Sequence, residues 1–126
     1  MLRDFRNLVS EVRMSFTQIA FSSSRNGALD IYLMSIDGSV VTRLTNMPAR
    51  DVHTAWSPDG RRIAFTSARD GNDEIYVMQT DGSHVRRITH HPERDQFPTW
   101  HPDGRHVLAA SERYGRFDLY LFDVPK

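Results

Sequence analysis

The sequence predicts an all-β protein whose fold is a partial β-propeller of about two and a half four-stranded antiparallel blades. The first indication is a tandem repeat. Residues 63–106 match residues 19–62 without a gap at 23 of 44 positions, and Ile63-Ala64-Phe65 repeats Ile19-Ala20-Phe21 (63 − 19 = 44). A third, shorter copy occupies residues 107–126. A period of about 40 to 45 residues is typical of four-stranded propeller blades.

The second indication is turn chemistry that recurs with the same period. The run 52–56, predicted as strand a, is followed by Ser57-Pro58-Asp59-Gly60, and the corresponding turn is His101-Pro102-Asp103-Gly104. Proline presets φ, aspartate bonds nearby backbone amides and glycine accepts a positive φ, so both segments are predicted to be hairpin turns. Strand b therefore begins just after each turn, at 63–67 in the second copy.

The third indication is a short apolar run buried on both faces. After Asp70-Gly71, residues 74–78 are apolar without alternation from Ile75 onward, which is typical of a strand covered on two sides. This is predicted strand c. Asp81-Gly82 then leads into strand d at 85–89, where two arginines suit a half-solvated outer edge.

Counting these strands gives b, c and d in the first copy, all four in the second, and a, b and c in the third. Closed propellers need about four to eight blades, and an uncapped array leaves an apolar face and a strand edge in water. We therefore expect that copies of this chain form a homo-oligomer that completes a ring. The alternative is that the chain is a fragment of a longer propeller.

Residues 1–18 do not fit the repeat and are treated as a separate leader. Asp4 is placed to cap a short N-terminal helix, whose apolar face would consist of Phe5, Leu8, Val9 and Val12. The alternative is an additional edge strand over residues 9–16. Residues 19–126 then form the repeat region.

Composition narrows the classes of partner and compartment. Sixteen basic and sixteen acidic residues give a net charge of zero and are interspersed, which argues against a nucleic-acid partner. With no cysteine the chain forms no disulfide. The sequence shows neither a signal peptide nor a membrane span, so the expected location of the chain as written is the cytoplasm.

No motif of an enzyme is present. The sequence lacks a Gly-x-Ser-x-Gly elbow, a glycine-rich phosphate loop and a His-Glu-x-x-His helix. The six histidines show no spacing typical of a metal site, so we expect no metal and no cofactor. The sequence therefore predicts a non-enzymatic protein.

The repeat resembles a known family. The run from Trp56 to Ser67, followed by residues 74–78 and by Asp81-Gly82, resembles the TolB-type (WD-like) β-propeller repeat, and the likeness covers residues 19–126. Members of this family serve as periplasmic binding proteins, as scaffolds and as gating propellers of peptidases, so the resemblance implies binding more readily than catalysis. TolB-like proteins usually carry six blades, a secretion signal and a further domain. A longer TolB-like protein would be periplasmic.

Two further sets of residues recur with the period. Trp56 and Trp100 are expected to pack between blades. Arginines that follow a serine of strand b are expected to pair with an acidic residue five positions later, across the b–c turn. These predicted pairs are Arg25 with Asp30, Arg69 with Glu74, and Arg113 with Asp118.

The candidate binding site lies in the two connections from strand d to strand a, 48–51 and 92–95. Such loops lead into the innermost strands and surround the mouth of a propeller channel, where they are suited to hydrogen-bond a protein or peptide partner. The alternative is that Asp51 and Asp95 only bond backbone amides of the adjacent blade. The predicted site residues are Arg50, Asp51, His53, Arg94, Asp95 and Gln96.

Overall fold

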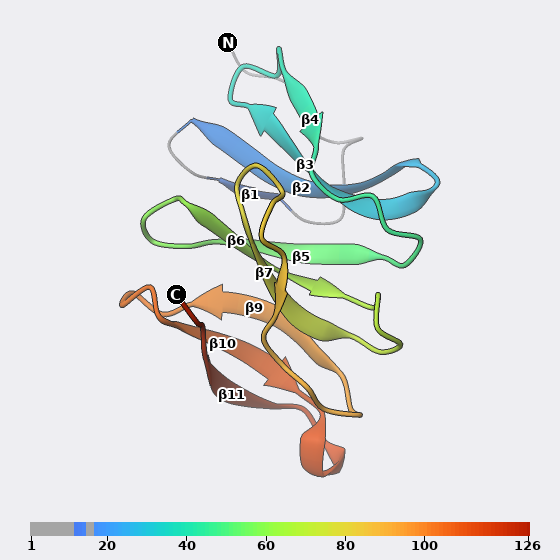
Figure 1. Ribbon diagram of the computed structural model, residues 1–126, viewed down its shortest axis with the longest axis vertical. Helices are drawn as coiled ribbons and strands as arrows, with labels where there is room; N and C mark the ends of the chain where they lie inside the picture. The colour runs from blue at the N-terminus through green and yellow to red at the C-terminus, as the bar shows by residue number, and fades with distance from the viewer. Residues whose placement is uncertain (1–11, 15–16) are drawn as a thin grey trace.

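The computed structural model describes residues 12–14 and 17–126, which form three antiparallel sheets stacked along the long axis of the molecule (Figure 1). Hydrogen bonds join the strands in the orders β1-β2-β3-β4, β5-β6-β7-β8 and β11-β10-β9. A short 3-10 turn, η1 (Arg113–Gly115), connects the last two strands. The prediction of a partial propeller is confirmed. The strands are β1 (Val12–Met14), β2 (Gln18–Asn26), β3 (Ala28–Ser35), β4 (Val41–Arg43), β5 (Asp51–Trp56), β6 (Arg62–Ser67), β7 (Glu74–Gln79), β8 (Arg86–Arg87), β9 (Asp95–Trp100), β10 (His106–Ser111) and β11 (Asp118–Asp123).

Strand β1 takes the inner position of the first sheet, which the strand count from the repeats had left open. It pairs with β2 in the register Val12↔Phe21 to Met14↔Ile19. Most of the predicted N-terminal helix falls outside the described residues, but Val12, which was assigned to its apolar face, lies in a strand. β1 also lies within the range 9–16 given for the alternative edge strand. The described residues thus make two four-stranded sheets and one three-stranded sheet.

The hydrophobic core lies between neighbouring sheets. Strand β7 shows why its run is continuously apolar: Tyr76 and Met78 pack toward the first sheet, whereas Ile75 and Val77 pack toward the third. The expected packing of Trp100 is confirmed, since its side chain is buried among residues of the second and third sheets. Its indole Nε1 donates a hydrogen bond to the carbonyl of Ala55 at 3.1 Å. Both faces of the middle sheet are therefore covered.

The predicted turns are also present. The amide of Gly60 donates to the Ser57 carbonyl at 2.9 Å, and Gly60 has the positive φ of 71° that the turn chemistry requires. Gly82 has a second constraint, because a Cβ at this position would lie 2.7 Å from the carbonyl oxygen of Leu44 in the first sheet. The c–d turn of the second sheet thus approaches the backbone of its neighbour closely.

The outer face of the third sheet is exposed in this chain. Leu119 and Leu121 are 69% and 55% exposed, whereas the residues 44 positions earlier, Ile75 and Val77, are 0% and 4% exposed. A face that is covered on the middle sheet is thus open on the third. On the other side of the stack, the first sheet carries a buried cluster, which consists of Ile19, Phe21, Tyr32 and Met34.

Candidate functional site

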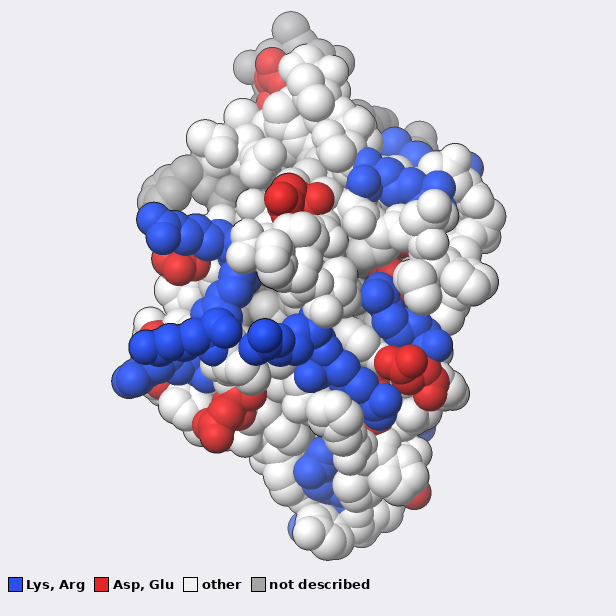
Figure 2. All heavy atoms as spheres, in the orientation of Figure 1, with Lys and Arg blue, Asp and Glu red and all other residues white. Residues whose placement is uncertain are grey.

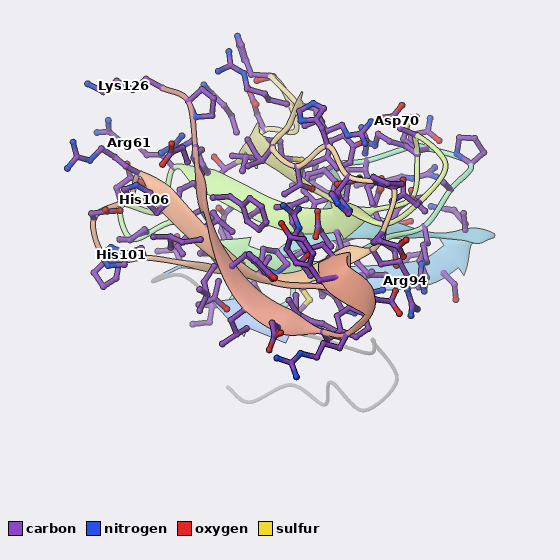
Figure 3. The ribbon with its side chains drawn as sticks, turned by 90° about the horizontal axis from the view of Figure 1, so that it is seen from below. Arg61, Asp70, Arg94, His101, His106 and Lys126 are labelled. Carbon is purple, nitrogen blue, oxygen red and sulfur yellow. The ribbon has the colours of Figure 1, made fainter. Side chains whose placement is uncertain are left out.

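The candidate site lies at the end of the sheets where the d–a loops enter β5 and β9. Figure 3 shows Arg94 and Asp70 at this end, whereas Arg61, His101 and His106 lie at the opposite end. The two d–a loops are held in the same way, since the amide of Ala68 donates to the Arg50 carbonyl and the amide of Glu112 donates to the Arg94 carbonyl. The b–c turns therefore fix both loops at equivalent places.

Asp51 and Asp95 form buried ion pairs at the start of the inner strands. The guanidinium of Arg69 lies 3.0 Å from Asp51, and that of Arg113 lies 3.1 Å from Asp95. Both aspartates are 0% exposed. Each uses Oδ2 for the arginine, whereas Oδ1 has no hydrogen-bond donor among residues 17–126. Burial raises the pKa of Asp51, and this effect outweighs the opposing influence of the Ser67 hydroxyl and of Arg69.

This arrangement corrects the expected charge pairs. Arg69 and Arg113 pair with the inner strand of their own sheet and not with the acidic residue across the b–c turn. The register explains this result, because Asp51 faces Ser67 in the a–b ladder and Arg69 follows two residues later. The acidic residues take other arginines: Arg43 pairs with Asp30, Arg87 with Glu74, and Arg116 with Asp118.

Asp73 connects the second and third sheets at this end. Its carboxylate accepts hydrogen bonds from Arg50 Nη2 at 2.5 Å and from Gln96 Nε2. Its carbonyl accepts from the amide of Asp95 at 2.8 Å. Asp73 was not predicted as a site residue, yet it brings together two predicted ones, Arg50 and Gln96.

Arg94, the equivalent of Arg50 on the third sheet, is also held by a carboxylate, but from a position that is not equivalent to Asp73. Its guanidinium makes two hydrogen bonds with the carboxylate of Glu112, at 2.8 and 3.1 Å, and lies over the ring of Phe117. The side chains of Arg94 and Arg50 are 50% and 48% exposed. The two arginines are therefore accessible while they are held in place.

His53 and Phe97 occupy equivalent positions, 44 residues apart, in β-bulges of the inner strands. Both have a φ of 57°, which is unusual for residues other than glycine. In β5 two residues oppose one of β6, and β9 repeats this arrangement against β10. The two rings stack with centroids 4.0 Å apart and an interplanar angle of 27°. Phe97 is 54% exposed and was missed as a site residue.

The predicted residues therefore divide into two groups. Asp51, Asp95 and Gln96 are buried and hold the loops, whereas Arg50 and Arg94 are exposed and His53 is half-buried. We call the accessible set of Arg50, His53, Arg94 and Phe97 the d–a rim. It offers two guanidinium groups and an aromatic stack to a ligand.

At the opposite end, Asp103 accepts a hydrogen bond from His106 Nδ1 at 2.6 Å and lies 3.3 Å from His101 Nδ1. His106 Nε2 lies 3.0 Å from Asp123. The backbone amide of Arg105 and the nearby histidines hold the pKa of Asp103 far below its usual value. These residues belong to the a–b turn and the adjacent strands of the third sheet.

Residues 12–14 and 17–126 contain no cluster of three or more histidines and carboxylates placed to hold a metal ion. Figure 2 shows basic and acidic side chains interspersed over one face, with several basic side chains across its middle. In the described part of the chain no helix is long and apolar enough to cross a membrane.

The geometry defines the class of this protein as a partial antiparallel β-propeller built from repeated sheets. A family model described as the TolB beta propeller domain matches residues 14–126. The chain therefore belongs to the TolB β-propeller domain family. A search of curated proteins finds no significant match.

Solved structures agree with this assignment. The putative TolB from Agrobacterium tumefaciens is 35% identical with a TM-score of 0.82, over 94% of this chain and 47% of that one. TolB from Acinetobacter baumannii is 26% identical with a TM-score of 0.72, over 86% of this chain and 27% of that one. The tricorn protease shares the fold. It is 16% identical with a TM-score of 0.69, over 91% of this chain and 12% of that one. The chain spans less than half the length of each of these structures.

Proposed function

We propose that this chain is a non-enzymatic interaction module that presents the d–a rim to a protein or peptide partner. The observation that carries the proposal is the repeated placement of Arg50 and Arg94, each about half exposed and each oriented by a carboxylate. An oriented guanidinium binds carboxylates and carbonyls with defined geometry, and it loses less side-chain entropy on binding than a mobile one. The balanced charge of the sequence favours a protein over a nucleic acid.

The proposal is tested by affinity capture with paired variants. Immobilised wild-type protein and the double variant Arg50→Ala/Arg94→Ala are exposed to the same bacterial envelope extract, and retained proteins are quantified by mass spectrometry. The control is Arg61→Ala/Arg116→Ala, which removes two exposed arginines outside the rim. A partner of the rim is lost with the first variant and retained with the control. Identical capture by all three proteins would contradict the proposal.

We further propose that a second copy of this chain covers the exposed face of the third sheet in a propeller ring. The repeat supports this, because Leu119 and Leu121 correspond to Ile75 and Val77, which another sheet covers. Closed symmetric association is the usual way in which identical chains bury such a face. The competing source of cover is the remaining blades of a longer, periplasmic TolB-like protein.

A second candidate function is an accessory propeller that gates a peptidase or another hydrolase. The likeness to the tricorn protease and to an acylaminoacyl peptidase, with TM-scores of 0.69 and 0.63, favours it at the level of the fold. The coding sequence next to this chain separates the two functions. A hydrolase domain there supports gating, and an envelope lipoprotein gene supports the interaction module.

A further inference from the structure

We propose that the stacked rings of His53 and Phe97 determine what the d–a rim binds, and that they receive an aromatic side chain of the partner next to a carboxylate. This inference rests on the proposed function and names the ligand class of the same site. Four observations carry it: the backbone of the two bulges, the anchoring of the rings, their exposure, and the charges around them.

The backbone of each bulge contains one residue in an unfavourable conformation with a positive φ. A residue other than glycine in the left-handed region costs on the order of 1 to 3 kcal/mol where the structure holds it there. His53 and Phe97 both adopt this conformation, and each is the first of the two residues that bulge from the inner strand. Bulges redirect side chains and are frequent next to active sites, and residues with a strained backbone cluster at functional sites.

The two rings are anchored by the same hydroxyl group. Thr66 Oγ1 lies 3.2 Å from His53 Nδ1 and accepts a hydrogen bond from the amide of Phe97 at 3.2 Å. Thr66 is 0% exposed. One buried threonine of the middle sheet therefore fixes residues of two inner strands, so that the stack is formed before a ligand arrives. Preformed aromatic surfaces bind with a small loss of conformational entropy.

Phe97 presents a large apolar surface to solvent, since 54% of the residue is exposed although it lies in an inner strand. A further aromatic ring can extend the His53–Phe97 stack, in the offset or edge-to-face geometry that aromatic pairs prefer. Aliphatic side chains gain the burial but not the ring contact. An aromatic residue is therefore the side chain that this surface fits best.

The exposed cations of the d–a rim, Arg50 and Arg94, lie three residues before His53 and Phe97 in the chain. Arg50 and Arg94 are about half exposed, whereas the carboxylates of Asp51, Asp73 and Asp95 are at most 2% exposed. The acidic groups that oppose them are exposed Glu93, the 50% exposed side chain of Asp70, and the 28% exposed side chain of Glu112, which Arg94 already binds. A carboxylate beside the bound aromatic ring thus meets Arg50 or Arg94, and this charge complementarity favours an acidic flank on the partner.

The test uses three small probes: N-acetyl-tryptophanate, N-acetyl-tryptophan amide and N-acetyl-leucinate. Each is titrated into the wild-type protein, and binding is followed by the backbone amide NMR shifts of His53 and Phe97. We expect the tryptophanate to bind most tightly. The amide should bind about two- to fivefold more weakly because it lacks the charge, and the leucinate at least about fivefold more weakly because it lacks the ring.

The matched variants are Phe97→Asn and Tyr114→Asn. Asparagine tolerates a positive φ, so that Phe97→Asn removes the ring and keeps the backbone. Tyr114 is likewise an exposed aromatic residue with a φ of 65°, but it lies outside the stack, in η1. We expect Phe97→Asn to weaken the binding of both tryptophan probes about fivefold or more. Tyr114→Asn should bind both probes as tightly as the wild-type protein does. Far-UV circular dichroism checks that both variants are folded.

His53→Asn provides a second removal of the stack should Phe97→Asn not fold. Equal binding of the tryptophan and leucine probes, or equal loss with Tyr114→Asn, overturns the inference. The proposed function fails separately, because it depends on capture that is lost with the Arg50 and Arg94 variant. If the Phe97→Asn variant captures the partner as well as the wild-type protein does, the proposed function stands and the aromatic ligand is rejected.

Discussion

The guanidinium of Arg69 lies 3.0 Å from the fully buried carboxylate of Asp51, and the side chain of Arg69 is itself only 13% exposed. The pair closes the a–b hairpin of the second sheet at the end where the binding loops enter. Because 44 residues later Arg113 and Asp95 repeat the contact, it belongs to the repeat and holds each loop in its place.

We expect Arg69→Met to lower the free energy of unfolding at pH 7 by about 3 kcal/mol, since it leaves an ionised Asp51 buried without its partner. Burial already raises the pKa of Asp51 above 3.8, so the ionised carboxylate is unfavourable in the folded state. The loss of stability that this ionised form causes is present only at pH values above about 3.8. The deficit should therefore shrink as the pH falls toward 4. Urea unfolding at several pH values measures it. Arg69→Met/Asp51→Asn should recover part of the loss, and a deficit independent of pH would contradict this account.

We expect the opposite dependence of stability on pH for Asp103. The folded state lowers its pKa, so its contribution to stability is present above the ordinary value near 3.8 and is lost as the pH falls through the depressed value. Asp103→Asn should lower the melting temperature at pH 6 and have a progressively smaller effect below pH 4. Asp123→Asn, at a side chain that is 93% exposed, is the control and should change the melting temperature less. If the loss of melting temperature caused by Asp103→Asn grows as the pH falls, the folded state does not lower the pKa of Asp103.

Gly60 and Gly82 separate the cost of backbone conformation from that of close packing. Both have a positive φ, of 71° and 85°, so alanine at either position costs about 1 kcal/mol. At Gly82 the added Cβ also meets the Leu44 carbonyl at 2.7 Å, whereas the space around Gly60 is open. We expect Gly82→Ala to destabilise the protein by at least about 1 kcal/mol more than Gly60→Ala in chemical unfolding. Equal effects would mean that the neighbouring sheet moves away at no cost.

The exposed face of the third sheet leads us to expect that the protein associates in solution. Light scattering at micromolar concentration should give a mass of two or more chains, and Leu119→Asp/Leu121→Asp should give a monomer. The control is Ile36→Asp/Val40→Asp, at residues that are 51% and 59% exposed in the turn between β3 and β4, and it should leave the mass unchanged. A well-folded wild-type monomer would reject self-association and favour a longer natural protein.

The sequence predicts the sheets well because the repeat, the proline–aspartate–glycine turns and the apolar runs are local signals. The two bulges carry only a weak signal, since histidine is enriched among non-glycine residues with a positive φ but phenylalanine is not. Phe97 was therefore missed. The pairing of Arg69 with Asp51 was also missed because it depends on the register between strands a and b, whereas the predicted pair with Glu74 follows from spacing along the chain.

The 44-residue unit of the sequence is offset from the sheet of the structure. The unit 19–62 contributes β2, β3 and β4 to the first sheet and β5 to the second, so each inner strand is encoded together with the sheet before it. Excision of one unit therefore divides two sheets and yields none intact. A minimal single blade would have to be cut between strands d and a, near residues 48 and 92, and gene duplication that copies the 19–62 unit links each new blade covalently to its predecessor.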